Sequence, residues 1–139
     1  MRILGIDYGD ARTGLSVSDQ TGLLAGSPSV IEEWNHARLL ERLAQYIKEE
    51  RIEEIVLGYP KNMDGTAGAR AQKCEAFAQE LEGLTGLPVT LWDERRTTVA
   101  AHAILHGNGK KMKKHRRTVD AVAATLILQN YLDWRRTQP

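Results

Sequence analysis

The stretch ILGIDYGDARTG, residues 3–14, decides the fold of this chain. Its first residues form an apolar run that predicts a buried strand at 2–8, and Asp7 ends this run. After a glycine-flanked turn, apolar and polar residues alternate over 13–19, which predicts a second strand. Gly22 marks another turn before a third strand at 23–31. The N-terminal part of the chain is therefore predicted to be an antiparallel meander.

Beyond the meander, predicted strands alternate with predicted helices. Apolar residues at helical spacing predict helices at 36–50, 66–84 and 97–105, with a final helix that Thr118 can cap and that reaches Trp134. Short apolar runs predict strands at 55–57 and 89–93. This order of elements indicates an α/β fold with one mixed sheet and helices packed on it.

Composition excludes several other classes of protein. With 139 residues, of which 42% are apolar and 27% charged, the chain is long enough for one globular domain and too apolar for a disordered one. No apolar run approaches the roughly 20 residues that cross a bilayer, and the N-terminus lacks the pattern of a signal peptide. The sequence thus predicts a cytoplasmic protein without membrane contact. The single Cys74 excludes an internal disulfide and a cysteine-based zinc cluster.

Three carboxylates lie at predicted edges of structure, far apart in the chain. Asp7 closes the first strand, Glu94 follows the strand at 89–93, and Asp120 opens the apolar C-terminal helix. Because sites in such sheets form beyond the carboxyl ends of parallel strands, we expect folding to bring these acids together. Converging carboxylates can hold Mg²⁺ or Mn²⁺ against a phosphate group, which makes the chain a candidate metal-dependent nuclease.

Each of these acids also has a purely structural explanation. Asp7 can cap a turn, and an acid such as Asp120 is favoured at a helix start by the helix dipole. Strand alternation sends Asp93 and Glu94 to opposite sides, so only one of the two is expected in a shared site. We prefer Glu94, and Asp93 stays open as the alternative.

The net charge of +1 conceals a strongly basic segment. Residues 110–117 contain six of the 19 Lys and Arg residues, which leaves 13 basic and 18 acidic residues elsewhere, a net charge of −5. Such a segment is typical of a contact with a polyanion, although a solvated loop is the simpler explanation for a charge run. Its position directly before Asp120 favours phosphate binding. The residues expected to contact nucleic acid are Lys61, Arg95, Arg96, Lys110, Lys111, Lys113, Lys114, Arg116 and Arg117.

The tryptophans give no second signal for nucleic-acid binding. Trp34, Trp92 and Trp134 are too scattered along the chain to form a platform on which bases stack. We therefore expect all three to pack in the interior.

Four short motifs occur in an order and at a spacing that resemble a known family. They are GIDYG at 5–9, GYP at 58–60 with DGT at 64–66, DER at 93–95 and DAVAA at 120–124. Together they are similar to the YqgF/RuvX family of Holliday-junction-resolvase-like or pre-16S rRNA nucleases, and the resemblance spans essentially the whole chain.

The resemblance implies a single RNase H-like nuclease domain over residues 1–139, with a five-stranded mixed sheet and helices on both faces. It also implies a cytoplasmic phosphodiesterase that uses Mg²⁺ or Mn²⁺ and matures the 5′ end of 16S rRNA. The implied partners are structured RNA and ribosomal precursor particles, with branched DNA as the alternative substrate, and the chain would act as a monomer or homodimer. Carried over by motif, Asp7, Glu94 and Asp120 are the metal-binding acids.

Two other functions stay open at this point. A non-catalytic RNA-binding factor of ribosome assembly would need the same fold and the same residue types. The segment 7–14 also resembles the phosphate-binding hairpin of actin-like and sugar-kinase folds, which would indicate ATP binding. That superfamily needs two such domains, however, and 139 residues supply only one.

Overall fold

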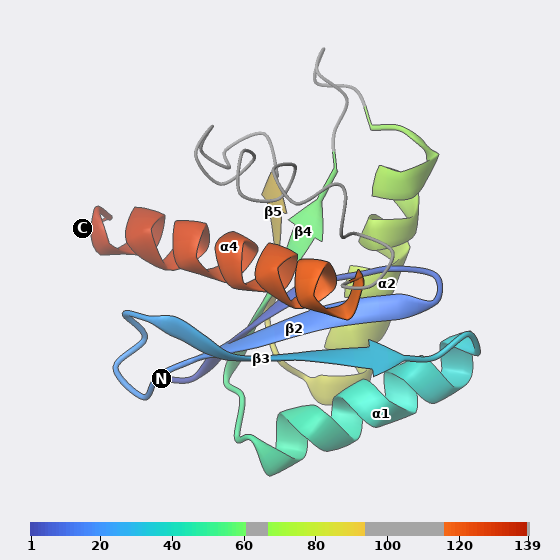
Figure 1. Cartoon of the computed structure of the whole chain (residues 1–139), viewed down its shortest axis with the longest axis horizontal. Helices are drawn as coiled ribbons and strands as arrows, with labels where there is room; N and C mark the ends of the chain where they lie inside the picture. Colours follow the sequence, from blue (N-terminus) through green and yellow to red (C-terminus); the bar gives the residue numbers. More distant parts are fainter. Residues whose placement is uncertain (61–66, 94–115, 139) are drawn as a thin grey trace.

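A five-stranded mixed sheet forms the centre of the protein in the computed structural model, which describes residues 1–60, 67–93 and 116–138 (Figure 1). The strands are β1 (Ile3–Asp7), β2 (Arg12–Ser18), β3 (Ala25–Glu32), β4 (Glu54–Tyr59) and β5 (Val89–Asp93). They lie in the order β3-β2-β1-β4-β5. The first three strands pair antiparallel, whereas β4 and β5 run parallel to β1. The predicted meander and mixed sheet are confirmed.

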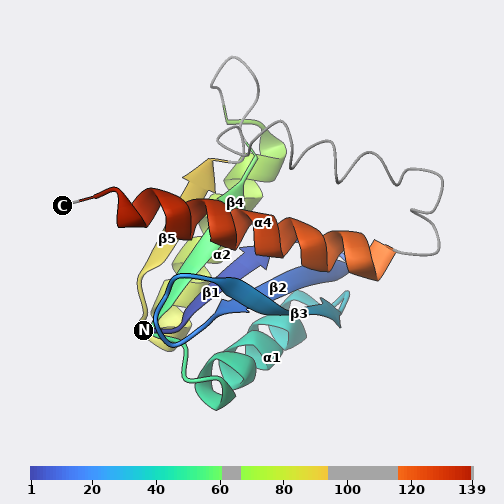
Figure 2. The same cartoon turned by 60° about the vertical axis from the view of Figure 1, so that its left-hand side comes forward.

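Helices cover both faces of this sheet. α1 (His36–Glu49) and α2 (Ala69–Thr85) lie on one face, and α4 (Arg116–Arg136) crosses the other, as Figure 2 shows. The alternation of side chains along β1 separates the two layers, because Leu4 and Ile6 pack with α1 and α2 while Ile3 packs with α4. We call these the α1/α2 face and the α4 face.

The backbone of α4 lies directly on β1. A Cβ atom built on Gly5 would be 2.7 Å from the Cβ of Leu128 and 3.1 Å from the carbonyl oxygen of Ala124. Only glycine allows this separation, since real Cβ atoms do not come this close to other atoms. The contact fixes the height of α4 above the sheet and, with it, the position of the first turn of the helix.

The helix starts differ from those predicted. α4 begins at Arg116, so Thr118 belongs to its first turn and the prediction that Thr118 caps the helix is wrong. α2 begins at Ala69 after the N-cap residue Gly68, later than the predicted start at 66. The helix predicted at 97–105 lies outside the described residues. Within the described parts of the chain, no helix is long and apolar enough to cross a membrane.

The tryptophans behave in two ways. Trp92 is buried on the α4 face, and its ring centroid lies 5.6 Å from that of Trp134 and 5.5 Å from that of Tyr131. The expected interior packing is confirmed for Trp92, whereas Trp134 packs against these rings but stays 41% exposed. Trp34, which follows β3, is 82% exposed, so the expectation that it packs in the interior is wrong.

Candidate active site

Asp7 lies at the carboxyl end of β1 and on the α4 face. Its place follows from the alternation of the strand, in which Ile3 and Gly5 contact α4 and Asp7 is the next residue on that side. The residue is half-buried, at the edge of the sheet where the parallel strands β1 and β4 end. The predicted position at a strand end is confirmed.

Gly14 brings Asp120, near the start of α4, to the same place. The Cα atoms of Asp7 and Gly14 are partners in the antiparallel pairing of β1 with β2. A Cβ atom on Gly14 would lie only 2.0 Å from the carbonyl oxygen of Asp120. Asp7 and Asp120 therefore lie around one glycine, although 112 residues separate them in the chain, and Figure 2 shows the start of α4 over this end of the hairpin.

Arg12 joins these two acids. It opens β2 on the same face as Gly14, and its Nε donates a hydrogen bond to Oδ2 of Asp120 at 3.1 Å. The side chains of Arg12 and Asp120 are 33% and 25% exposed, so the ion pair is largely shielded from solvent. Arg12 is not among the residues predicted from the sequence. The sequence pointed to Arg12 only through its position two residues before Gly14, since this spacing puts both residues on one face of the strand.

Asp93 lies on the other side of the sheet. Its neighbour Trp92 belongs to the core under α4, so alternation turns Asp93 towards α2. The pKa of Tyr59 agrees with this placement, since it is raised first by a hydrogen bond to Glu75 of α2 and, to a smaller extent, by the charge of Asp93. Asp93 thus does not share a face with Asp7 and Asp120.

The remaining predicted site residues lie mostly beyond the described parts of the chain. Glu94, Lys61, Arg95, Arg96, Lys110, Lys111, Lys113 and Lys114 fall within 61–66 and 94–115, outside those parts. Arg116 and Arg117 open α4, four and three residues before Asp120 in the same helix. Among the described residues, no three His, Cys, Asp or Glu side chains form a group that could hold a metal ion.

The chemistry of the donors present fits a hard divalent cation. Asp7 and Asp120 offer carboxylate oxygens, which Mg²⁺ and Mn²⁺ prefer over nitrogen or sulfur. Mg²⁺ is commonly bound by only one or two carboxylates together with waters and phosphate oxygens. The close approach of backbones at Gly14 keeps this corner free of a side chain between the two acids. The backbone thus brings Asp7 and Asp120 to one corner of the α4 face, and their role as metal ligands stays a prediction.

The chain matches known proteins over nearly its full length. Residues 1–134 match the family model described as RuvX, Holliday junction resolvase. A protein of Lachnospira eligens is 44% identical over 136 residues, covering 96% of this chain and 97% of its own. A protein of Bacillus subtilis is 43% identical over 135 residues, covering 96% and 98%. Both bear the name "Putative pre-16S rRNA nuclease".

Solved structures of resolvases share the fold. RuvC of Thermus thermophilus in complex with a Holliday junction substrate superposes with a TM-score of 0.63 at 15% identity, covering 99% of this chain and 96% of RuvC. The Fowlpox virus resolvase in complex with junction DNA also gives a TM-score of 0.63, at 10% identity and 97% and 99% coverage. The RNase H-like fold expected from the sequence is thereby confirmed. With the family model matched over residues 1–134 and relatives above 40% identity, the chain belongs to the RuvX family of Holliday junction resolvases.

Proposed function

We propose that this protein is a divalent-metal-dependent endonuclease that hydrolyses phosphodiester bonds in structured RNA, with the 5′ end of pre-16S rRNA as its substrate. The convergence of Asp7 and Asp120 around Gly14 on the α4 face carries the proposal. Family membership and the names of the relatives in Lachnospira eligens and Bacillus subtilis support a nuclease that acts on this RNA. The cytoplasm is the proposed compartment.

In the proposed mechanism, Asp7, Asp120 and Glu94 hold one or two Mg²⁺ or Mn²⁺ ions. A bound cation of this kind supplies Lewis-acid stabilisation of the charge that develops on the phosphate oxygens during in-line attack by water. Arg12 keeps the carboxylate of Asp120 oriented through its hydrogen bond at 3.1 Å. Glu94 is the third acid of choice, because Asp93 turns towards α2 and away from the α4 face.

The basic residues hold the substrate in place. Lys110, Lys111, Lys113, Lys114, Arg116 and Arg117, with Lys61, Arg95 and Arg96, supply positive charge for the phosphate backbone. Such contacts position the nucleic acid without reading its sequence. Specificity would then come from the shape of the RNA or from ribosomal precursor particles.

Two alternatives use the same acids differently. A resolvase of branched DNA is favoured by the description of the family. A non-catalytic RNA-binding factor of ribosome assembly would keep the fold and bind without cleaving.

Cleavage assays on single-residue variants decide between these functions. We expect Asp7→Asn, Asp120→Asn and Glu94→Gln each to lower Mg²⁺-dependent cleavage of a 5′-extended 16S rRNA fragment roughly 100-fold or more, because a metal ligand contributes several kcal/mol. Asp93→Asn is the matched control and should stay near wild type. Titration calorimetry with Mn²⁺ should show weaker binding in the first three variants only.

The outcomes separate the proposals. Cleavage that survives both Asp7→Asn and Asp120→Asn would overturn the metal site. Faster cleavage of a four-way DNA junction than of the RNA would favour the resolvase, and RNA binding without cleavage in the wild type would favour the assembly factor.

A further inference from the structure

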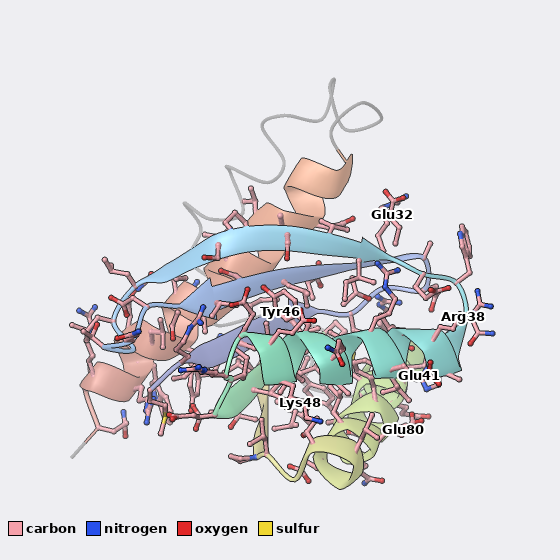
Figure 3. All side chains as sticks on the ribbon, turned by 90° about the horizontal axis from the view of Figure 1, so that it is seen from below. Glu32, Arg38, Glu41, Tyr46, Lys48 and Glu80 are labelled. Atoms are coloured by element: carbon pink, nitrogen blue, oxygen red, sulfur yellow. The ribbon has the colours of Figure 1, made fainter. Side chains whose placement is uncertain are left out.

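A hollow of about 410 Å³ opens on the α1/α2 face, beside the turn that follows β1. Its walls come from the β1–β2 turn, the connection from β3 to α1, and α2. The residues that matter here are Tyr8, Asp10, Trp34, His36, Lys73 and Glu80. Figure 3 shows α1 and α2 side by side on this face, with Glu80 projecting from α2. The hollow is separate from the α4 face, on which Asp7 and Asp120 lie.

Trp34 is the most unusual residue of this hollow. It is 82% exposed, more than any other large hydrophobic residue in the described part of the chain. It precedes Asn35, whose side chain caps α1 by accepting a hydrogen bond from the backbone N–H of Arg38 at 3.0 Å. A hydrophobic residue at this position usually packs on the fourth helical residue, here Leu39. Leu39 is 3% exposed while Trp34 stays in solvent, so capping does not account for the indole.

A fixed aromatic ring lies at the base of the hollow. The ring of Tyr8 stacks on that of the buried Phe77 with centroids 4.1 Å apart and planes 2° apart. Burial is the main cause that raises the pKa of the Tyr8 hydroxyl, with the charge of Lys73 opposing it. Tyr8 therefore remains a neutral hydrogen-bond donor at neutral pH.

The polar groups around these rings are paired with one another. Lys73 Nζ lies 3.3 Å from Oδ1 of Asp10, and Nε2 of His36 lies 3.0 Å from both carboxylate oxygens of Glu80. Glu33 also lines the hollow, and its carboxylate lies 3.5 Å from a guanidinium nitrogen of Arg42. Each of the three carboxylates of the lining thus has a nitrogen partner, and the hollow presents these paired groups beside an open aromatic face. A planar, neutral, polar group fits this chemistry, and a nucleobase is such a group.

The hollow is adjacent to the candidate active site along the backbone. Tyr8 and Asp10 directly follow Asp7, and three residues of fully extended chain span at most roughly 10 Å. Arg70 and Lys73, near the start of α2, are exposed cations beside the β1–β2 turn. Nη1 of Arg70 lies 3.9 Å from Oδ2 of Asp10 in that turn. They can hold the phosphates of a strand that passes from the α4 face around the turn.

We infer that this hollow binds an unpaired nucleobase next to the cleaved phosphodiester, stacked on the indole of Trp34. The inference rests on the proposed nuclease function and adds a determinant of specificity, since it selects substrates with an unstacked base beside the cleavage position. A single base on an aromatic side chain contributes enough affinity to be measured, so a continuous platform is not required.

A binding assay tests this inference. The fluorescence anisotropy of a labelled RNA hairpin with a short single-stranded overhang is measured in EDTA as protein is added. Trp34→Ala should weaken binding about 5- to 150-fold, the equivalent of about 1–3 kcal/mol for one stacked base. Trp34→Phe should restore most of the affinity. Leu24→Ala, which truncates another exposed apolar residue, is the control and should bind as wild type. With abasic sites in the overhang, wild type and Trp34→Ala should bind equally.

Two results would overturn the inference. Equal affinity of Trp34→Ala and wild type for the intact hairpin would show that the hollow does not bind a base, and would favour a protein partner instead. If Trp34→Ala lost the same affinity for the intact and the abasic hairpins, the substitution would act on the contact with the RNA backbone or on the fold, and not on a stacked base. Because binding is measured without metal, neither result depends on whether Asp7 and Asp120 support cleavage.

Discussion

Arg12 is the residue whose replacement tests the electrostatics of the site most directly. Its Nε donates to Asp120 at 3.1 Å, so it balances a carboxylate that a divalent cation would otherwise neutralise. We expect Arg12→Gln to lower the free energy of unfolding in EDTA by about 1 kcal/mol, as for a partly shielded charged hydrogen bond. The same change should tighten Mn²⁺ binding, because a competing positive charge is removed.

Urea unfolding and calorimetry with Mn²⁺ measure both effects. Arg38→Gln, at an exposed position of α1, is the matched control and should change neither quantity. Weaker Mn²⁺ binding in Arg12→Gln would contradict the prediction and show that orienting Asp120 outweighs the competition between charges.

Asp19 offers a second test at the scale of one residue. Its carboxylate accepts hydrogen bonds from the Thr21 hydroxyl at 2.8 Å and the Leu23 backbone N–H at 3.0 Å, and these lower its pKa, Thr21 most. Because the pKa of Asp19 is lower in the folded state, its ionised carboxylate stabilises the β2–β3 turn at pH values above the unfolded-state pKa. This stabilisation is lost as the pH falls through the folded-state pKa. We expect Thr21→Val to raise the pKa of Asp19, measured by NMR titration of its carboxyl carbon. Thr137→Val should leave it unchanged.

The contact between α4 and β2 governs the site at the scale of elements. Gly14→Ala would place a methyl group 2.0 Å from the carbonyl oxygen of Asp120, so the start of α4 around Asp120 must move. We expect a loss of at least about 2 kcal/mol in urea unfolding, at the upper part of the range for overpacking, and loss of cleavage. Gly26→Ala, whose nearest neighbour is 4.0 Å away, is the control and should stay close to wild type in both. Full activity in Gly14→Ala would show that α4 does not position the acids.

The elements themselves were predictable because their signals are local. Apolar spacing located α1, whose buried residues are Leu39, Leu43 and Ile47, and the apolar run at 3–6 placed Asp7 at a strand end. The side of the sheet that Glu94 takes stays a prediction, because this residue lies outside the described parts of the chain. The pairing of Arg12 with Asp120 spans 108 residues, and no local pattern encodes such a contact. The start of α4 was also mispredicted, since Thr118 lies inside the helix and its capping preference did not locate the helix start.

The exposure of Trp34 shows the same limit at the next level of organisation. Composition treats a tryptophan as a core residue, and packing with Tyr131 and Trp134 justifies this for Trp92. Trp34 lies at the connection from β3 to α1, where the positions of α2 and the β1–β2 turn decide whether it is covered. Two elements that are distant in the sequence, α2 and the β1–β2 turn, therefore determine the exposure of Trp34.

Over the whole molecule, charge is divided between residues 110–117 and the rest of the chain, which carries a net charge of −5. If this segment contacts phosphates, each neutralised lysine should lower the slope of log affinity against log salt by about 0.7 to 0.9. We expect the triple change Lys110→Gln, Lys111→Gln and Lys113→Gln to reduce the slope by roughly 2 to 3 and to weaken binding equally for RNAs of different sequence. Arg38→Gln, Lys48→Gln and Arg51→Gln change net charge by the same amount at exposed positions around α1. Anisotropy titrations at several salt concentrations measure both slopes, and equal reductions in the two triple variants would show that net charge, and not the basic segment, attracts the nucleic acid.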